Sequence, residues 1–197
     1  SNYKQLQAIT SNYKQLQAIT SKIVFPLLVA IITLLNVNLY AYPVKDCVMA
    51  SPTYHITSPT TASTLGLSGT LSGVSFFIEA DFTIDVASLD FNNCLFKVKD
   101  GVKISVKANN VNFEACNLYA CGNYTNKWWG IDIDIPSTVS PKSFSITDTK
   151  IENAVYGNNI DDQEDLTYIS AKNDYFNNHI GINISGKVTF ICESIFS

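Results

Sequence analysis

Apolar and polar residues alternate in short segments through the second half of the chain. One core pattern, apolar-x-apolar-x-(small or polar)-x-x-apolar, can be placed five times, with copies beginning at Leu89, Val111, Phe144, Ile169 and Thr189. Strict alternation is typical of β-strands with one buried face. The small or polar position marks a tight turn between two strands. The pattern therefore predicts repeated pairs of short strands.

A second alternating segment, which opens with glycine, follows each of the first four copies at Gly101, Gly130, Gly157 and Gly181. The final apolar positions of successive copies are 22, 33, 25 and 20 residues apart. A strand pair of this size cannot bury its apolar face alone, so the period favours stacking into a solenoid. An antiparallel sandwich is the alternative fold for strands of this length.

Asn or Asp stands at the turn position of three copies, as Asn93, Asp148 and Asn173. These side chains bond to nearby backbone groups and tolerate the left-handed conformation. In a solenoid, equivalent residues of successive coils lie about 4.8 Å apart. We therefore expect asparagine side chains to hydrogen-bond from coil to coil.

The first 75 residues do not share this pattern. Residues 1–10 are repeated letter for letter at 11–20, and we interpret this part as a duplicated, disordered leader outside the fold. Residues 21–41 combine Lys22, a short apolar run and Ala41, which predicts a signal-peptide helix cleaved after Ala41 or, as second choice, Ala50. An uncleaved membrane anchor is the alternative. Residues 42–75 are expected to form an irregular cap segment, and residues 76–197 an all-β parallel β-helix of about five visible coils, truncated at its C-terminus.

The charge of the chain is mild. The net charge is −4, and all 13 basic residues are lysine. Recognition of phosphates and base edges relies heavily on the forked guanidinium group of arginine. The composition therefore argues against a nucleic-acid partner, and a membrane contact is expected only through an uncleaved signal segment.

Several short motifs resemble the right-handed parallel β-helix domains of the pectin-lyase-like superfamily, in particular secreted proteins of Bacteroidetes-type bacteria. The resemblance covers about 120 residues. Its motifs are Asn92-Asn93-Cys94-x-Phe96, Cys121 followed by Trp129-Gly130-Ile131, Ile151-Glu152-Asn153-Ala154 with Gly157, and Phe176-Asn177-Asn178 with Gly181-Ile182.

The superfamily includes lyases, hydrolases, adhesins and stalks, so the resemblance implies a fold more than an activity. Its hydrolases carry an Asp-Asp motif, which only Asp161-Asp162 matches here, and the arginine elements of its enzymes have no counterpart. We therefore expect a non-catalytic secreted or cell-surface β-helix, adhesin-like or carbohydrate-contacting, that binds a polysaccharide or a cell-surface glycan. The alternative is a relative of polysaccharide lyases or glycoside hydrolases that acts on acidic polysaccharide. No catalytic residue is assigned.

Outward-facing acidic residues form the most specific candidate for a metal-binding or catalytic site. Counting from each glycine predicts two columns across the coils: Lys103, Asp132, Asn159 and Asn183; and Ser105, Asp134, Asp161 and Ser185. Asp134 and Asp161 would lie about 5 Å apart, with Asp132 and Asp162 close by. Clustered carboxylates suit calcium, and a carboxylate pair can act on a glycosidic bond. The simpler interpretation is a solvated acidic surface in which Lys103 pairs with Asp132.

The remaining candidates are two tryptophans, for sugar contact, and three cysteines, for disulfide bonds. The resemblance implies that Trp129, which precedes Gly130-Ile131, packs inward, as the equivalent tryptophan does in the similar domains. Trp128 has the opposite parity, so it is expected to point outward as a sugar contact. Cys94 and Cys116 occupy equivalent positions in consecutive copies, which predicts either a disulfide or a ladder of free thiols. A bond between Cys116 and Cys121 is the alternative pairing. The cysteine spacing gives no zinc motif.

Overall fold

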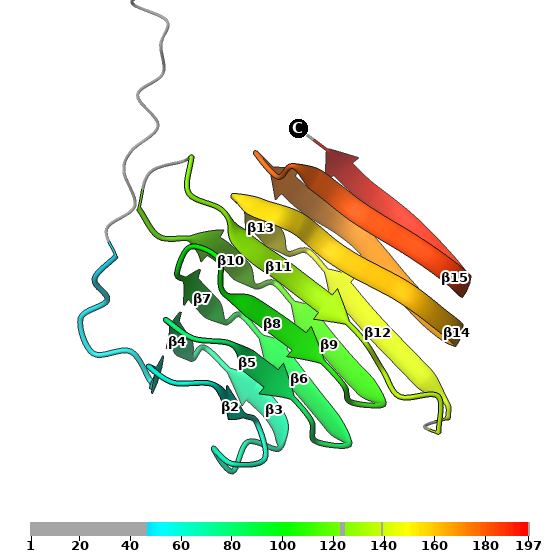
Figure 1. The fold of residues 1–197 in the computed structure, drawn as a ribbon, viewed down its shortest axis with the longest axis horizontal. Helices are drawn as coiled ribbons and strands as arrows, with labels where there is room; N and C mark the ends of the chain where they lie inside the picture. The colour runs from blue at the N-terminus through cyan, green and yellow to red at the C-terminus, as the bar shows by residue number, and fades with distance from the viewer. Residues whose placement is uncertain (1–46, 123–124, 139, 197) are drawn as a thin grey trace, which may run out of the picture. The chain divides into compact units, whose positions relative to one another are not determined.

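The structure is a computed structural model that describes residues 47–122, 125–138 and 140–196. Within these residues the chain forms a parallel β-solenoid of about six turns, and every strand pairing is parallel (Figure 1). The predicted all-β class and parallel solenoid are therefore confirmed. The predicted leader and signal peptide, residues 1–41, lie outside the described part. Among the described residues there is no helix with the length and apolarity needed to span a membrane.

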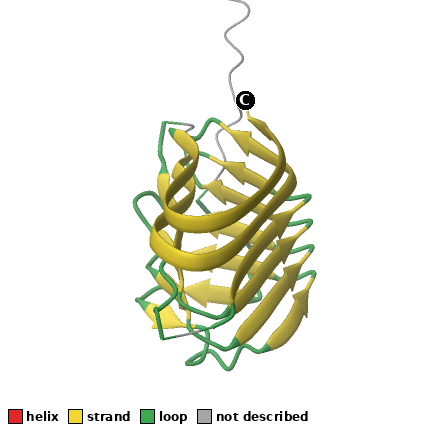
Figure 2. Ribbon diagram, turned by 90° about the vertical axis from the view of Figure 1, so that its right-hand side faces the viewer, coloured by secondary structure: helices red, strands yellow, loops and turns green. Residues whose placement is uncertain are grey.

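The strands stack into three faces that run the length of the solenoid (Figure 2). The first face contains β1 (Tyr54–Ile56), β4 (Ser75–Ile78), β7 (Leu95–Val98), β10 (Asn117–Ala120) and β13 (Lys150–Glu152). The second face contains β2 (Thr60–Thr61), β5 (Phe82–Ile84), β8 (Lys103–Val106) and β11 (Trp128–Ile133). The third face contains β3 (Gly69–Ser72), β6 (Ser88–Asn92), β9 (Asn110–Glu114) and β12 (Lys142–Thr147). The long strands β14 (Ala154–Phe176) and β15 (Ile180–Phe196) bend around the solenoid and continue all three faces.

The solenoid begins earlier than expected. Strands β1, β2 and β3 form a first coil within the segment that was predicted to be an irregular cap, and the coil count rises from five to six. Ile56, Ala62 and Leu67 are buried in the core from this coil. The Ser/Thr-rich composition hid these strands because only a few of their residues point inward.

Phenylalanine rings fill the interior of the lower coils, the N-terminal part of the solenoid from β4 to β9. Phe76 stacks on Phe96 with a ring-centroid distance of 4.7 Å, and Phe91 stacks on Phe113 at the same distance. All four side chains have no exposed surface. Parallel strands about 4.8 Å apart place identical residues of successive coils in direct contact. The alternating apolar positions predicted for these copies are therefore the core positions.

The turn predicted in each repeat adopts the left-handed conformation. Asn93, Ala115, Asp148 and Lys172 have φ values between 48° and 55°. Asn93 and Asp148 confirm the prediction, but Asn173 was wrong by one residue. Asn173 instead points inward, where its Oδ1 accepts a hydrogen bond from the backbone N–H of Thr149 at 2.9 Å.

The error at Asn173 reflects a shift of the whole fourth copy. Phe144 pairs with Tyr168 and Ile146 with Ser170, so the inward residues are Tyr168 and Ser170 rather than Ile169 and Ala171. The fifth copy is shifted in the same way, because Tyr168 pairs with Phe190. The apolar pattern selected the wrong parity here because this part of the interior is polar.

The cysteines pair differently from either predicted disulfide. Cys121 is bonded to Cys47, whereas Cys94 and Cys116 are buried free thiols. The alternative of a thiol ladder is the correct one for Cys94 and Cys116. Contact with the Cys94 thiol and burial both raise the pKa of Cys116. The 74-residue separation of Cys47 and Cys121 could not be inferred from repeat spacing, because Cys47 precedes the first coil.

Candidate functional site

The outward side of the second face carries a row of polar side chains, one from each coil. The strand register aligns Thr61, Thr83, Ser105, Asp132, Asn159 and Asn183. Asn183 donates to Asn159 at 2.7 Å, and Asn159 donates to Asp132 at 2.8 Å. Asparagine side chains therefore bond from coil to coil on this face, at residues other than the turn positions for which such bonding was predicted.

The predicted column was wrong in its first member. Ser105 aligns with Asp132, whereas Lys103 aligns with Gly130. Gly101 and Gly130 are not equivalent residues: Gly101 lies in the turn before β8, with φ of 73°, and Gly130 lies inside β11. Counting from the two glycines therefore displaced the first coil by two residues.

A second polar row lies two residues further along each strand. The pairing of Ile133 with Val106 and Ile160 sets Lys107, Asp134 and Asp161 side by side on adjacent coils. Lys107 Nζ lies 3.7 Å from Asp134 Oδ2, and Asp161 accepts a hydrogen bond from Ser185 at 2.7 Å. Asp134 and Asp161 are neighbours as predicted, but Lys107 replaces Ser105 at the start of the row.

These rows border a groove of about 440 Å³ on the second face. The residues around it share hydroxyl, carboxylate or ammonium groups, with one proline: Pro59, Thr60, Thr61, Asp81, Thr83, Lys103, Ser105, Lys107, Asp132 and Asp134. Sequence reasoning missed the lower half of this groove. The alternation Phe82-Thr83-Ile84-Asp85 was the signal that could have revealed it.

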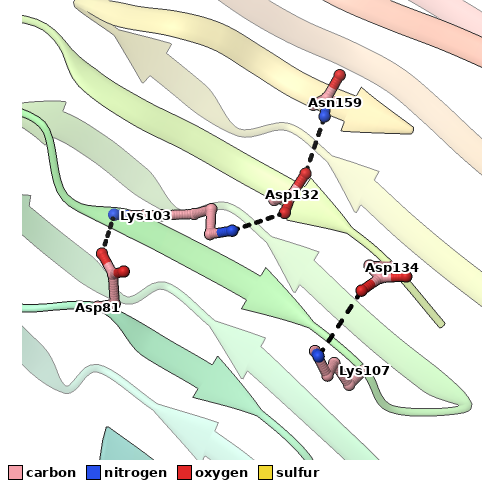
Figure 3. A network of polar contacts seen from close by, with 6 residues as sticks. All are labelled: Asp81, Lys103, Lys107, Asp132, Asp134 and Asn159. Carbon is pink, nitrogen blue, oxygen red and sulfur yellow. Dashed lines mark hydrogen bonds and ion pairs between the residues drawn. The ribbon is translucent and has the colours of Figure 1, made fainter. Parts of the chain in front are cut away.

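Lys103 links the groove's two central carboxylates (Figure 3). Its Nζ lies 3.1 Å from Asp132 Oδ2, and its backbone N–H donates to Asp81 Oδ1 at 2.9 Å. Asp132 Oδ1 accepts the bond from Asn159, so both oxygens of Asp132 have partners. The predicted pairing of Lys103 with Asp132 is confirmed.

The acidic side chains do not converge on one point. Within the described part of the chain, no group of three or more His, Cys, Asp or Glu side chains is placed to hold a metal ion. Asp132 and Asp134 each face a lysine ammonium, and the side chain of Asp162 lies outside the description. Calcium would have to displace Lys103 and Lys107, so calcium binding stays a prediction.

The two tryptophans have the opposite orientation from the one expected. Trp128 has no exposed surface and its indole N–H donates to the backbone oxygen of Glu152 at 3.0 Å, whereas Trp129 is 40% exposed. The alternation breaks at a register shift between Gly130 and Ile131, where Gly130 has φ of 117°. The prediction of Trp128 as the sugar contact was therefore wrong, because its ring cannot be reached from solvent.

Trp129 instead presents its ring on the second face, on the same strand as Asp132. Its ring lies edge-on to Tyr156, with centroids 5.4 Å apart and an interplanar angle of 61°. Tyr156 aligns in turn with Ile180, which is 36% exposed. An exposed aromatic and apolar patch thus lies beside the polar rows.

Comparison of the chain with protein-family models, with curated proteins and with solved structures found no match.

Proposed function

We propose that this chain is a non-catalytic β-helix of the cell surface or secreted space, and that its second face contacts carbohydrate. The observation that carries the proposal is the exposed ring of Trp129 on β11, the strand that also contributes Asp132 to the groove. A sugar ring has an apolar C–H face and a rim of hydroxyl groups. An aromatic side chain covers the first, and a few fixed polar groups satisfy the second.

Two further features agree with this setting. The Cys47–Cys121 disulfide is typical of proteins in oxidising, exported compartments, and residues 21–41 have the pattern of a signal peptide. The motifs also resemble the pectin-lyase-like superfamily, whose lyases and hydrolases act on polysaccharides but which also includes stalks. That resemblance is part of the proposal, because only the parallel solenoid itself is established.

The hydrogen bonding of the carboxylates favours a binding role over catalysis. A glycosidase needs one carboxyl group to reach the glycosidic oxygen and a second to act on the sugar or on water. Both oxygens of Asp132 are occupied by Lys103 and Asn159, and Asp134 lies beside Lys107. Asp132 is thus held through both of its oxygens, and Asp134 is paired with a lysine rather than with a second carboxyl group.

The test is affinity electrophoresis of the full chain in gels that contain soluble polysaccharides. Trp129→Ala is compared with Tyr119→Ala, which removes a half-buried ring from β10 on the first face. We expect at least one polysaccharide to retard the wild type, and Trp129→Ala to weaken this binding about tenfold, about 1.4 kcal/mol. Tyr119→Ala should bind like the wild type.

Equal weakening by both variants, or no retardation by any polysaccharide, would contradict the proposal. Incubation of the same polysaccharides with the protein, followed by a reducing-end assay, addresses the enzymatic alternative. New reducing ends that depend on Asp132 would replace the binding proposal with a hydrolase or lyase.

A further inference from the structure

The charges that border the groove neutralise one another almost completely. The groove is bordered by three carboxylates, Asp81, Asp132 and Asp134, and by two ammonium groups, Lys103 and Lys107, which pair with Asp132 and Asp134. One negative charge is left in excess, on a chain whose net charge is itself −4. The groove therefore offers no free positive charge to an anionic ligand.

Asp85 adds to the negative potential at the lower end of the same row. Val106 pairs with Ile84, which places Asp85 next to Lys107. Asp85 accepts hydrogen bonds from the backbone N–H of Ser63 at 2.9 Å and from its hydroxyl at 2.6 Å. Burial works against ionisation, but these bonds hold the pKa of Asp85 below its usual value. Lys107 thus lies between two carboxylate positions.

Neutral hydrogen-bonding groups are what the groove does offer. Thr61, Thr83 and Ser105 occupy the same register position on three consecutive coils. Thr61 and Thr83 are half-buried and Ser105 is 6% exposed, and the Thr61 hydroxyl also contacts the hydroxyls of Ser63 and Thr64. Hydroxyl groups both donate and accept, and here they repeat about every 4.8 Å along the solenoid axis. A ligand with repeated hydroxyl groups matches such a row without carrying any charge.

From this geometry we infer that the ligand of the second face is an uncharged polysaccharide, and that Asp132 and Asp134 exclude uronic acid polymers. The inference rests on the carbohydrate-binding proposal and specifies its ligand class. A polyuronate would have to displace Asp132 from Lys103 and Asp134 from Lys107, and the displaced carboxylates would repel it. A neutral chain leaves both ion pairs intact.

The test removes the excluding charges and keeps the shape of the site. The full chain and the Asp132→Asn, Asp134→Asn variant are compared in affinity gels with galactomannan, xyloglucan or dextran, and with polygalacturonate or alginate. The control variant is Asp165→Asn, Asp174→Asn, which makes the same charge change at an exposed and a half-buried residue that pair with Lys187 and Lys150, away from the groove. Melting curves of all three proteins verify that the fold is kept.

We expect the wild type to bind a neutral polysaccharide with little dependence on salt, and to leave both uronates unbound. The Asp132→Asn, Asp134→Asn variant should gain uronate binding of at least about tenfold, and salt should weaken that binding because it is electrostatic. The control variant should not gain it.

Two results would overturn the inference, and they are distinguishable. Uronate binding by the wild type, or an equal gain in the control variant, would refute charge exclusion and leave carbohydrate binding in place. Absence of binding to every polymer, neutral and acidic, would refute both proposals.

Discussion

The lower coils and the upper coils of this solenoid both have a closely packed interior, but they fill it with different side chains. Between β4 and β9 the interior consists of stacked apolar rings such as Phe76 and Phe96. In β14 the interior is a hydrogen-bonded layer: Asn158 donates to the hydroxyls of Tyr168 at 2.6 Å and Tyr175 at 2.7 Å. Both layers are fully buried, although only the first is recognisable from hydrophobicity.

The difference shows what specifies each region. A stack of phenylalanines is stabilised by burial and dispersion, which are not directional. The layer around Asn158 is directional: Ser170 and Tyr175 lie 3.1 Å apart through their hydroxyls, and Asn173 donates to Ser170 at 3.0 Å. A shift of β14 by one residue would leave several of these buried groups without partners, which costs about 1–3 kcal/mol each. Three sets of substitutions test this difference between the two regions.

The largest effect is expected in the lower layer. The ring centroid of Phe113 lies 4.7 Å from that of Phe91 and 5.6 Å from that of Phe96, and Phe113 has no exposed surface. Phe113→Ala removes a ring from a continuous stack and should lower the free energy of unfolding by about 3–5 kcal/mol. Urea denaturation would measure this. A loss below about 1 kcal/mol would contradict the assignment of the Phe stack as the main source of stability.

Glycine substitutions separate close packing in the upper coils from turn conformation in the lower ones. A Cβ at Gly157 in β14 would lie 2.3 Å from the backbone oxygen of Gly181 and 2.6 Å from a ring carbon of Tyr175. Gly157→Ala should therefore cost about 3 kcal/mol, because the neighbouring coil must move.

Gly101→Ala is the matched control for Gly157→Ala. Gly101 has φ of 73° and nothing within 4 Å of the added carbon, so the expected cost is only the left-handed backbone, about 1 kcal/mol. Equal losses in thermal or urea unfolding would show that β15 does not pack on β14 as closely as described.

The smallest loss of stability is expected when one hydroxyl group is removed from the hydrogen-bonded layer or added to the apolar layer. Tyr168→Phe leaves the amide of Asn158 without one of its partners and should cost about 2 kcal/mol. The reciprocal change, Phe144→Tyr, places a hydroxyl in the adjacent apolar layer, where Phe144 stacks on Tyr168 at 5.7 Å. It should also destabilise, by about 1–3 kcal/mol. Urea unfolding of both variants would test this, and a neutral or stabilising result for Tyr168→Phe would show that the hydroxyl is not needed.

The sequence predicted the architecture because the Leu89, Val111 and Phe144 copies place apolar residues at the true core positions. It failed at Tyr168 and Ser170, because tyrosine and serine score as polar although a hydrogen-bonded layer can bury them. The upper members of the acidic columns were correct, since Gly130 begins a regular count toward Asp132 and Asp134. Trp128 and Trp129 were exchanged because a local register shift leaves no trace in alternation.

The contacts between segments far apart in the sequence could not be predicted either. The groove joins Thr60 and Thr61 from the first coil to Asp132 and Asp134 from the fourth. The first of these segments had no recognisable repeat. Likewise, the disulfide joins Cys47, which precedes β1 and the first coil, to Cys121, which directly follows β10.

The two tryptophans provide the most direct test of carbohydrate contact at the second face. Their indole N–H groups give separate NMR signals in one protein, and Trp128 is a built-in control because its N–H is bonded to Glu152 inside the solenoid. On titration with an oligosaccharide of a neutral polysaccharide that retards the protein in gels, we predict that the Trp129 signal moves in a saturable way while the Trp128 signal stays in place. If neither signal moves, or only that of Trp128, the second face is not the carbohydrate-binding surface.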